Sequence, residues 1–539
     1  MLDIKRLDHF GVVAGVIKDL GLIELIDRRF EKDDKQNIST GEAVAGMIVN
    51  GLGFTQKPMS LTPMFFENKP LDILFREGML PSHFNRFKLG RALDDLHEYG
   101  NEALFSEIAL NICEQEGIER KYSHLDTTSF SLTGKYLPDS DENEILITHG
   151  HSKDHHPDLK QAVLELVVTQ DGGIPFICKC HDGNASDNII FKDRVAAFVE
   201  QIKMGGQPTI IVMDSKGYSK KNAEFLRQID FITRVPGSFS LEGAMIDQAL
   251  YLTDRWDQIN DDYKIQSFYL NHLDFDQRWV VVWSKGAFER AVSSLEKKSK
   301  KEKVEIDKQL NKLSKQGFAS KEDALGAFRA IEEKWKYHKV ASIEYEEQIK
   351  YAKPGRPTEN TPIDRVEIFI KVKVIENTAY ILEQQQREAC FVLATTVDKK
   401  ELSDREILFN YKEQIKVEGG FRFLKDPLFF ASSLFVKKPS RIAGLLMVMT
   451  LSLMVYNIAE RRMRNELKSR EETIPNQIGK ATATPTLRWV FQIFEGINYV
   501  KLMVDNKIEY IVDGLTSLHK KILSLFGKTV CGIYQFSPI

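Results

Sequence analysis

"PTIIVMD", residues 208–214, is the stretch that decides the fold class. Its middle, from Ile210 to Met213, is an unbroken apolar run that is too short for a helix, so it predicts a central strand buried inside a sheet. The residue that follows this strand is acidic. Asp214 therefore stands at one edge of the sheet, either as a solvated strand end or as part of a site that other strand ends complete.

The segments around this strand predict a mixed α/β sheet. The turn residues Asp171, Gly172 and Gly173 separate two β-rich runs, which is the pattern of a hairpin. In chain order, the patterns are strand 122–126, hairpin 162–180, helix 187–202, strand 208–214, helix 220–229 and strand 230–236. This order is typical of a sheet whose first strands are antiparallel and whose later strands are connected by helices.

The length of the chain predicts several domains, because 539 residues are too many for one core. In the first part, residues 91–113 have an amphipathic helical pattern, and we expect short helices joined by loops. We expect a helical N-terminal domain (1–115, DNA binding or scaffold), a first part of the core (116–236), an insertion (237–400), a second part of the core (401–465) and a C-terminal helical region (466–539, dimerisation or DNA contact).

Composition bounds the function. Hydrophobic residues make up 42% and charged residues 28%, and the formal net charge is −3, which excludes a uniformly basic nucleic-acid binder but leaves local basic patches open. The lysine-rich run 297–303 is either a solvated helix face or a phosphate-contacting face. Five scattered cysteines predict reduced thiols and a cytoplasmic protein.

One segment has the composition of a membrane span. Residues 442–459 are uncharged over 18 positions, which is the lower limit for a transmembrane helix. The segment contains Thr450, Ser452 and Asn457, and it is the only one of its kind in the sequence. We interpret it as a core helix, and we expect no membrane partner.

Three acidic residues stand at positions that suit a metal site. Asp126 and Asp214 each end a predicted strand, and Glu418 lies on a predicted helix about 200 residues later. Neighbouring strand ends meet at one edge of a sheet, and a helix packed there can add a third carboxylate. Three oxygen ligands suit Mg²⁺, and two such ions support phosphodiester cleavage.

The segment around Glu418 predicts one continuous helix that Pro427 ends. At about 100° per residue, Tyr411, Gln414, Glu418 and Lys425 fall on one face, either as a functional face or as a polar solvent face. Ser403 and Glu406 form a capping box at the start of this helix, as Ser39 and Glu42 do for an earlier one.

Two adjacent glycines follow the acid. Gly419 and Gly420 each cost about 1 kcal/mol in a helix relative to alanine. They serve either the close approach of another backbone or a packing notch.

A histidine-rich stretch, residues 149–156, raises the alternative of a zinc site. Zinc ligands are fixed by regular structure, whereas this stretch has the pattern of a polar loop. We therefore favour phosphate contacts by Lys153, His155 and His156. The alternative of a histidine-based metallohydrolase predicts tightly bound zinc.

The acidic helix resembles a known family. Tyr411-x2-Gln414-x3-Glu418-x6-Lys425 is similar to Tyr-x2-Arg-x3-Glu-x6-Lys, the signature of a large superfamily of bacterial insertion-sequence transposases with an RNase H-like DDE core. Gln414 stands where arginine is usual. Further similar segments are LDTTSFSLTG (from Leu125), GHSKDHHPDLKQAVLELVV (from Gly150), HDGNASDN (from His181), VMDSKGY (from Val212) and GGFRFLKDPLFFASSLFVKKPSRIAGLLMVM (from Gly419).

The resemblance covers roughly residues 120–460 and implies a multidomain α/β protein: an RNase H-like mixed-sheet core interrupted by a strand-and-helix insertion, with a helical N-terminal domain. It implies a DNA transposase that cuts transposon ends and joins them to target DNA. Asp126, Asp214 and Glu418 would hold Mg²⁺, with two ions expected and Mn²⁺ as a substitute. Tyr411 and Lys425 would contact DNA.

A glutamine at position 414 can still donate a hydrogen bond to a phosphate, but it lacks the positive charge and the paired N–H donors of arginine. The expected partners are double-stranded DNA, both transposon ends and target, and a second copy of the chain in a homodimer on DNA. The alternatives are an RNase H-like nuclease without transposition and a domesticated DNA-binding protein.

Overall fold

The structure is a computed structural model that describes residues 2–537 except 32–35, 56, 135, 137–143, 154–155, 204–208, 353–355, 357–361, 427, 430–435 and 505–506. Two compact units make up the chain. Unit 1 comprises Met1–Thr233 and Phe409–Ile539, and unit 2 comprises Arg234–Leu408. The predicted insertion, 237–400, falls within unit 2.

The sheet of unit 1 is mixed, as the sequence predicts. Its strand order is β4-β3-β2-β5-β6. The strands are β2 (Tyr122–Leu132), β3 (Lys160–Thr169), β4 (Pro175–His181), β5 (Ile210–Met213) and β6 (Asp230–Arg234). The pairs β2–β3 and β3–β4 are antiparallel, whereas β2–β5 and β5–β6 are parallel. The buried run at 210–213 is thus a central strand.

Two local predictions need correction. The strand predicted at 122–126 continues to Leu132, so Asp126 lies within β2 rather than at its end. The helix predicted at 220–229 is reduced to α9 (Ala223–Leu226) and a 3₁₀ turn. The helical pattern at 91–113 is found as two helices, α6 (Arg86–Tyr99) and α7 (Asn101–Gln115), because Gly100 between them has φ 106°.

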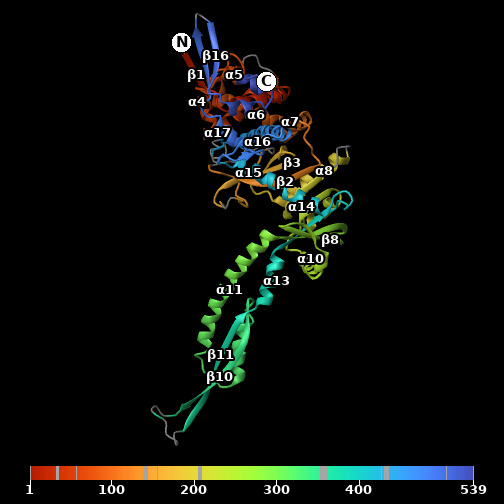
Figure 1. Cartoon of the computed structure of the whole chain (residues 1–539), viewed down its shortest axis with the longest axis vertical. Coiled ribbons are helices and arrows are strands. Elements are labelled where there is room, and N and C mark those ends of the chain that lie inside the picture. The colour runs from red at the N-terminus through yellow and green to blue at the C-terminus, as the bar shows by residue number, and fades with distance from the viewer. Residues whose placement is uncertain are drawn as a thin grey trace. The chain divides into compact units, whose positions relative to one another are not determined.

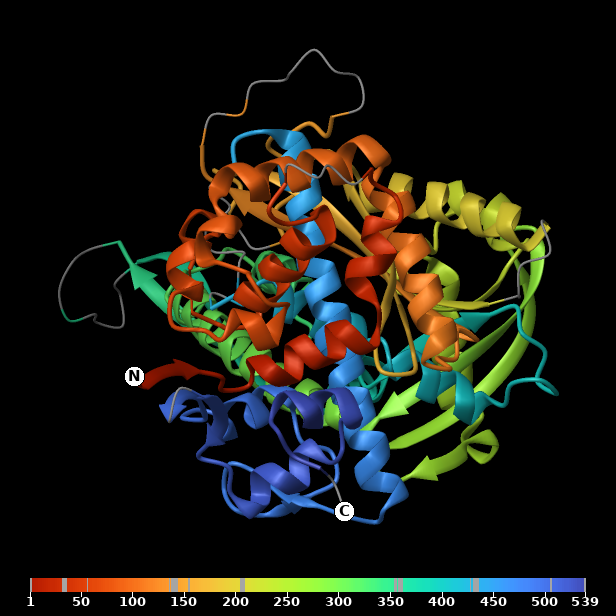
Figure 2. The same ribbon diagram turned by 90° about the horizontal axis from the view of Figure 1, so that it is seen from above.

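A long apolar helix, α16 (Pro439–Ser469), forms the core of unit 1 (Figures 1 and 2). It is the only helix among the described residues that is long and apolar enough to cross a membrane, and 94% of its apolar window is buried inside the fold. It packs against helices from both ends of the chain, against β4 and against α15. These helices are α1 (Phe10–Asp19), α3 (Thr40–Gly51), α6, α7, α15 (Ile415–Leu424) and α17 (Leu487–Ile493).

The remaining elements of unit 1 are short, apart from α8. They correct the prediction of a helical C-terminal region (466–539), whose described residues also contain four strands. Strands β1 (Leu2–Arg6), β15 (Asn498–Val504) and β16 (Lys507–Asp513) form a separate antiparallel sheet, and β13 (Ile474–Pro475) pairs with β14 (Ala481–Thr482). The helices are α2 (Leu22–Asp27), α4 (Thr62–Phe66), α5 (Leu71–Leu74), α8 (Asp187–Lys203), α18 (Ser517–Leu523) and α19 (Lys528–Ile533). The predicted capping box of Ser39 and Glu42 is present at α3.

Unit 2 combines an antiparallel sheet with long helices. Its strands run in the order β12-β9-β8-β7, and β10 and β11 form a separate two-stranded ribbon. The strands are β7 (Asp257–Asn260), β8 (Tyr263–His272), β9 (Phe275–Ser284), β10 (His338–Tyr351), β11 (Ile363–Glu376) and β12 (Cys390–Thr395). The helices are α10 (Ser240–Tyr251), α11 (Lys285–Leu313), α12 (Lys321–Glu332) and α13 (Thr378–Glu388).

A buried ion-pair network ties the sheet of unit 1 to two helices. Glu165 on β3 is 1% exposed and accepts hydrogen bonds from Arg194 on α8 at 2.5 Å and from His181 at 2.8 Å. Arg194 also donates to Glu102 on α7 at 2.6 Å. Burial alone would raise the pKa of Glu165, but the hydrogen bond from His181 and the charge of Arg194 outweigh burial and lower that pKa.

We predict that Glu165→Gln lowers the free energy of unfolding by about 3 kcal/mol at pH 7, because Arg194 loses its buried partner. The midpoint of chemical unfolding measures this loss. Because the folded-state pKa of Glu165 is lowered, the loss should be present above the ordinary carboxyl pKa and shrink as the pH falls below it. Glu114→Gln, on the exposed side of α7, is the matched control. Equal unfolding midpoints for the two variants would contradict the prediction.

Candidate active site

Two of the predicted acidic residues lie on neighbouring strands of the unit 1 sheet. In the parallel β2–β5 pair, Leu125 stands opposite Met213. The next residue after each of them is acidic: Asp126 on β2 and Asp214 at the end of β5. Pairing with β5 ends at this point although β2 continues, which leaves Asp126 beside the free end of β5. Both carboxylates line a cavity of about 20 Å³, which we call the acidic cavity. A cavity of this size holds about one water molecule or ion.

A third carboxylate enters this cavity from α8. Asp187, the first residue of α8, lines it together with Thr127 and Lys216. The Thr127 hydroxyl donates to Asp187 Oδ1 at 2.5 Å, and Lys216 Nζ donates to Asp187 Oδ2 at 2.7 Å. Sequence reasoning missed Asp187 as a site residue, although it lies in the family-like segment 181–188.

The side chain of Lys153 points into this acidic cluster. Its ammonium group donates to the carbonyl and hydroxyl oxygens of Thr127, both at 2.6 Å, and lies 3.3 Å from Asp187 Oδ1 and 3.9 Å from Asp126 Oδ1. The sequence predicts that Lys153 contacts phosphate from a loop, whereas in the structure its ammonium group contacts Thr127 and lies near two carboxylates. Lys153 supplies positive charge to the carboxylates.

Burial dominates the electrostatics of Asp126. Burial first, and then the charges of Asp214 and Asp187, raise the pKa of this carboxyl to about 6, although Lys153 and the backbone N–H of Thr127 act to lower it. The side chain retains 23% exposure. Burial makes the ionised form of this carboxyl unfavourable in the folded protein, and a cation bound beside it would offset that free-energy cost.

Glu418 does not line the acidic cavity. It lies on α15, which packs against β2 and β3, and its side chain is exposed. Across the residues that the structure describes, no group of three or more His, Cys, Asp or Glu side chains is placed to hold a metal ion. The structure therefore brings Asp126 and Asp214 together, and Glu418 as a third ligand stays a prediction.

The predicted continuous helix around Glu418 is wrong. The chain forms two helices, α14 (Asp404–Lys412) and α15, and Tyr411 lies on the first whereas Glu418 lies on the second. Between them, the N–H groups of Gln414, Lys416 and Val417 bond to carbonyls three residues earlier rather than four. This tightens the turn to 3₁₀ geometry, so a calculation at 100° per residue does not apply.

The other predicted DNA contacts have different environments. Gln414 is 8% exposed, which leaves little of its surface for a phosphate. Lys425 ends α15 with its ammonium 5.7 Å from the ring centroid of Phe130. His156 has a side chain that is 60% exposed, and His155 lies outside the described residues, as does Pro427.

The zinc alternative gains no support in the described part of the chain, where no such ligand group occurs. His124 belongs to β2 and its side chain is fully buried. Burial lowers the pKa of His124 to about 4, so the ring is neutral at pH 7.

A second, larger cavity lies beside α15. It has a volume of about 620 Å³, and its lining includes five cationic and three acidic side chains. We call it the basic groove, and its cations are Lys416, Arg422, Arg461, Arg464 and Arg488. Four of these cations are paired with carboxylates: Lys416 with Glu413, Arg461 with Asp171, Arg464 with Glu460 and Arg488 with Asp426.

The two adjacent glycines of α15 both line the basic groove, for different reasons. A Cβ added to Gly419 would meet no atom within 4 Å, so this position faces open space. A Cβ added to Gly420 would lie 3.1 Å from Leu453 Cδ2 of α16, which is the geometry of a packing notch. The packing notch therefore applies to Gly420, whereas the close approach of another backbone at Gly419 stays a prediction.

Comparisons with known proteins identify relatives of the chain. A family model described as "Transposase DDE domain" matches residues 125–458, more than half of the chain. A second model, a domain of unknown function named DUF4277, matches residues 2–110. No curated protein matches.

Among solved structures, the chain is similar to the piggyBac transposase synaptic complex with hairpin DNA, determined by cryo-EM. The identity is 7%, the TM-score is 0.34, and the match covers 92% of this chain and 82% of that chain. At this TM-score the likeness carries no argument.

We predict opposite effects for alanine at the two glycines. Gly419→Ala should raise the free energy of unfolding by about 1 kcal/mol, because alanine favours a helix and no atom obstructs it. Gly420→Ala should be neutral or destabilising, because its methyl group presses on Leu453. Thermal unfolding of both variants beside wild type is the measurement. Equal shifts of the two melting temperatures would show that the contact with α16 does not distinguish them.

Proposed function

The chain belongs to the transposase DDE domain family, and from this premise we propose that it cuts the ends of a mobile element and joins the freed 3′-hydroxyl groups to target DNA. The family match agrees with the prediction of a DDE transposase. An origin in bacterial insertion sequences and the Tyr-Arg-Glu-Lys grouping remain part of the proposal. The matched residues include Asp126, Asp214 and Glu418.

The observation that carries the proposal is the pair Asp126 and Asp214 in one cavity at the end of β5. The residues present fit a hard divalent cation: their donors are carboxylate oxygens, and one carboxyl has a pKa that burial raises to about 6. Asp126 and Asp214 would hold Mg²⁺, or Mn²⁺ in its place, with Glu418 as the third ligand. When bound, two such ions activate water or a 3′-hydroxyl and stabilise the leaving oxygen.

The chain's own residues prepare this site. Lys153 counters the charge of Asp126 and Asp187, which lets three carboxylates share a small volume. Thr127 and Lys216 fix the two oxygens of Asp187. These contacts hold the acidic side chains in place before substrate arrives.

The basic groove gives DNA a place beside the helix of Glu418. Among the described residues, Arg422 is the one cation of the five without an ion pair, so it suits a phosphate oxygen, and Gly419 leaves open space through which a DNA backbone can approach α15. Because two ends of an element must be joined together, we propose a homodimer on DNA.

We predict that Mg²⁺ or Mn²⁺ raises the melting temperature of the wild-type protein at pH 8 and that Asp126→Asn abolishes this rise. At pH 5 the metal-induced rise should also shrink, because protonation at a pKa of about 6 removes a ligand and weakens binding by roughly tenfold per pH unit. Thermal unfolding with and without metal measures both effects. Asp193→Asn, on the exposed face of α8, is the matched control.

The same variant tests the cost of ionising Asp126. Because the folded-state pKa is raised, the folded protein is penalised progressively between pH 4 and pH 6 and fully above pH 6. Without metal, Asp126→Asn should thus be more stable than wild type at pH 8, by at most about 3 kcal/mol, and equally stable below pH 4. A metal-induced rise that survives in Asp126→Asn would remove this carboxylate from the metal site.

We predict that Glu418→Gln abolishes cleavage and strand transfer while DNA binding persists. The substitution keeps the size of the exposed side chain but removes its charge, whereas phosphate contacts come from cations and backbone donors. End cleavage with Mg²⁺, strand transfer from precut ends and a gel shift on the same DNA measure the three steps. Glu401→Gln is the control, since Glu401 is exposed and lies outside unit 1.

The two reactions separate the outcomes. Near wild-type cleavage by Glu418→Gln would refute the three-carboxylate site. A wild-type protein that cuts DNA but does not transfer precut ends would instead be a nuclease of the same fold.

A further inference from the structure

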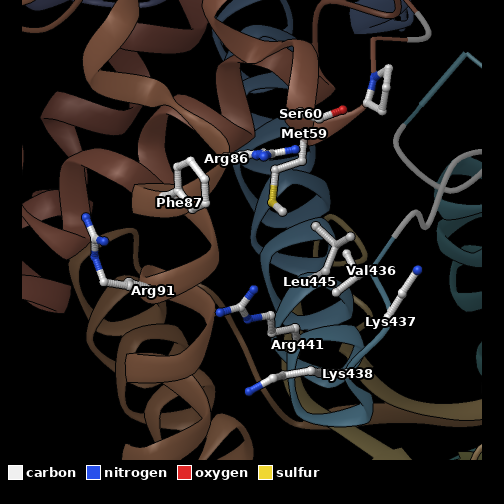
Figure 3. Close-up of a pocket in the computed structure, with 11 residues that line it drawn as sticks. Met59, Ser60, Arg86, Phe87, Arg91, Val436, Lys437, Lys438, Arg441 and Leu445 are labelled. Carbon is white, nitrogen blue, oxygen red and sulfur yellow. The ribbon is translucent and has the colours of Figure 1, made fainter. Parts of the chain in front are cut away.

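A third cavity lies between α6 and the start of α16, in unit 1 and apart from the acidic cavity (Figure 3). Its volume is about 470 Å³, within the range of pockets that bind small organic ligands. One wall comes from α6, a second from α16 and the residues before it, and a third from residues 58–60. The lining residues are Pro58, Met59, Ser60, Arg86, Phe87, Arg91, Val436, Lys437, Lys438, Arg441 and Leu445.

The lining is strongly cationic. It includes five Lys and Arg side chains and no acidic residue. Of the five, Arg441 is neutralised by Asp94 of α6, to which it donates two hydrogen bonds at 2.7 and 2.6 Å. The other four cations have no ion pair with any residue that the structure describes. A chain with a formal net charge of −3 thus concentrates unpaired positive charge at one cavity.

The position of Arg441 is built into both helices. A Cβ on Gly90 of α6 would lie 2.8 Å from Arg441 Nη1, so the absence of a side chain there admits the guanidinium group. Figure 3 shows Lys438 and Arg441 extending toward α6, whereas Lys437 extends away. The cavity also lies at the N-terminus of the 31-residue α16, where the helix dipole favours an anion.

An apolar surface accompanies this charge. Met59, Phe87, Val436 and Leu445 line the same cavity. Phe87 is 63% exposed, and the guanidinium carbon of Arg86 lies 4.8 Å from its ring centroid. An exposed aromatic ring beside an arginine is a surface on which a flat ring can stack.

We propose that this cavity binds a nucleotide unit. The phosphate would lie on Arg86, Arg91 and Lys438, and the base would pack against Phe87 and Met59. The nucleotide is either an unstacked unit of a DNA strand or a free nucleotide, since both present the same phosphate and ring.

Other occupants fit the cavity less well. A bare phosphate needs no apolar wall, and an apolar peptide does not need four unpaired cations. The proposal goes beyond the proposed function and does not depend on it, because none of the lining residues belongs to the acidic cavity or to the basic groove.

Two variants separate the two halves of the site. Arg86→Glu with Arg91→Glu reverses the charge at exposed positions of α6, and Phe87→Ala removes the exposed ring without changing charge. The matched control is Lys520→Glu with Lys528→Glu, which reverses two exposed lysines that do not line the cavity. The full-length protein is titrated with deoxyadenosine monophosphate, a single-stranded oligonucleotide, its duplex and inorganic phosphate at several salt concentrations.

We expect the double reversal to weaken single-strand binding at least tenfold beyond the control and to reduce the slope of log K against log salt by about 1.4, for two lost phosphate contacts. Phe87→Ala should weaken it by about fivefold to a hundredfold at an unchanged slope, with no effect on inorganic phosphate. If both variants bind deoxyadenosine monophosphate more weakly than wild type, the natural ligand is a free nucleotide. If both variants lose affinity for the single strand only, the natural ligand is a DNA strand.

The proposal is overturned if wild type binds neither the monophosphate nor the single strand, or if both variants bind as the control does. It is also overturned if Phe87→Ala changes nothing while the double reversal weakens every anion equally, because the cavity is then a phosphate surface only.

Discussion

The burial of α16 is the constraint on which the rest of unit 1 depends. Its apolar window is 94% buried, and such a helix in water needs covering on every side. The N-terminal helices cover part of it, and β4 and α15 cover other parts. Its hydroxyl groups are satisfied internally, since Thr450 and Ser452 donate to carbonyls four residues earlier. The N-terminal helices are therefore part of the same core as the sheet.

The same helix contributes cations to two cavities. Lys438 and Arg441 lie at its start in the nucleotide-type cavity, and Arg461 and Arg464 lie in the basic groove near its other end. At 1.5 Å per residue, the 20 positions from Arg441 to Arg461 span about 30 Å. A rigid helix thus fixes the distance between these two sets of cations, and a strand that contacts both has to span that length.

The sequence predicts those parts of the structure that depend on apolar pattern. The run 210–213 and the hairpin of β3 and β4 are found as predicted, because buried strands are continuous or alternating in hydrophobicity. The extension of β2 past Asp126 is not visible, because residues 127–131 include four Thr or Ser side chains besides Phe130 and lack an apolar run. Asp187 escapes prediction for another reason: it starts a helix, and only folding brings that helix start to β2.

The break between α14 and α15 shows what a signature spacing does and does not determine. No glycine or proline marks residues 412–415, so pattern alone predicts a continuous helix. A 3₁₀ turn advances about 120° per residue instead of about 100°, so three residues in this geometry shift the phase by about 60°. Tyr411 and Glu418 also lie on two separate helices, so no single helical face contains both. The signature spacing fixes how many residues separate Tyr411 and Glu418 from the tight turn between them. This turn sets the direction of Glu418 relative to the sheet.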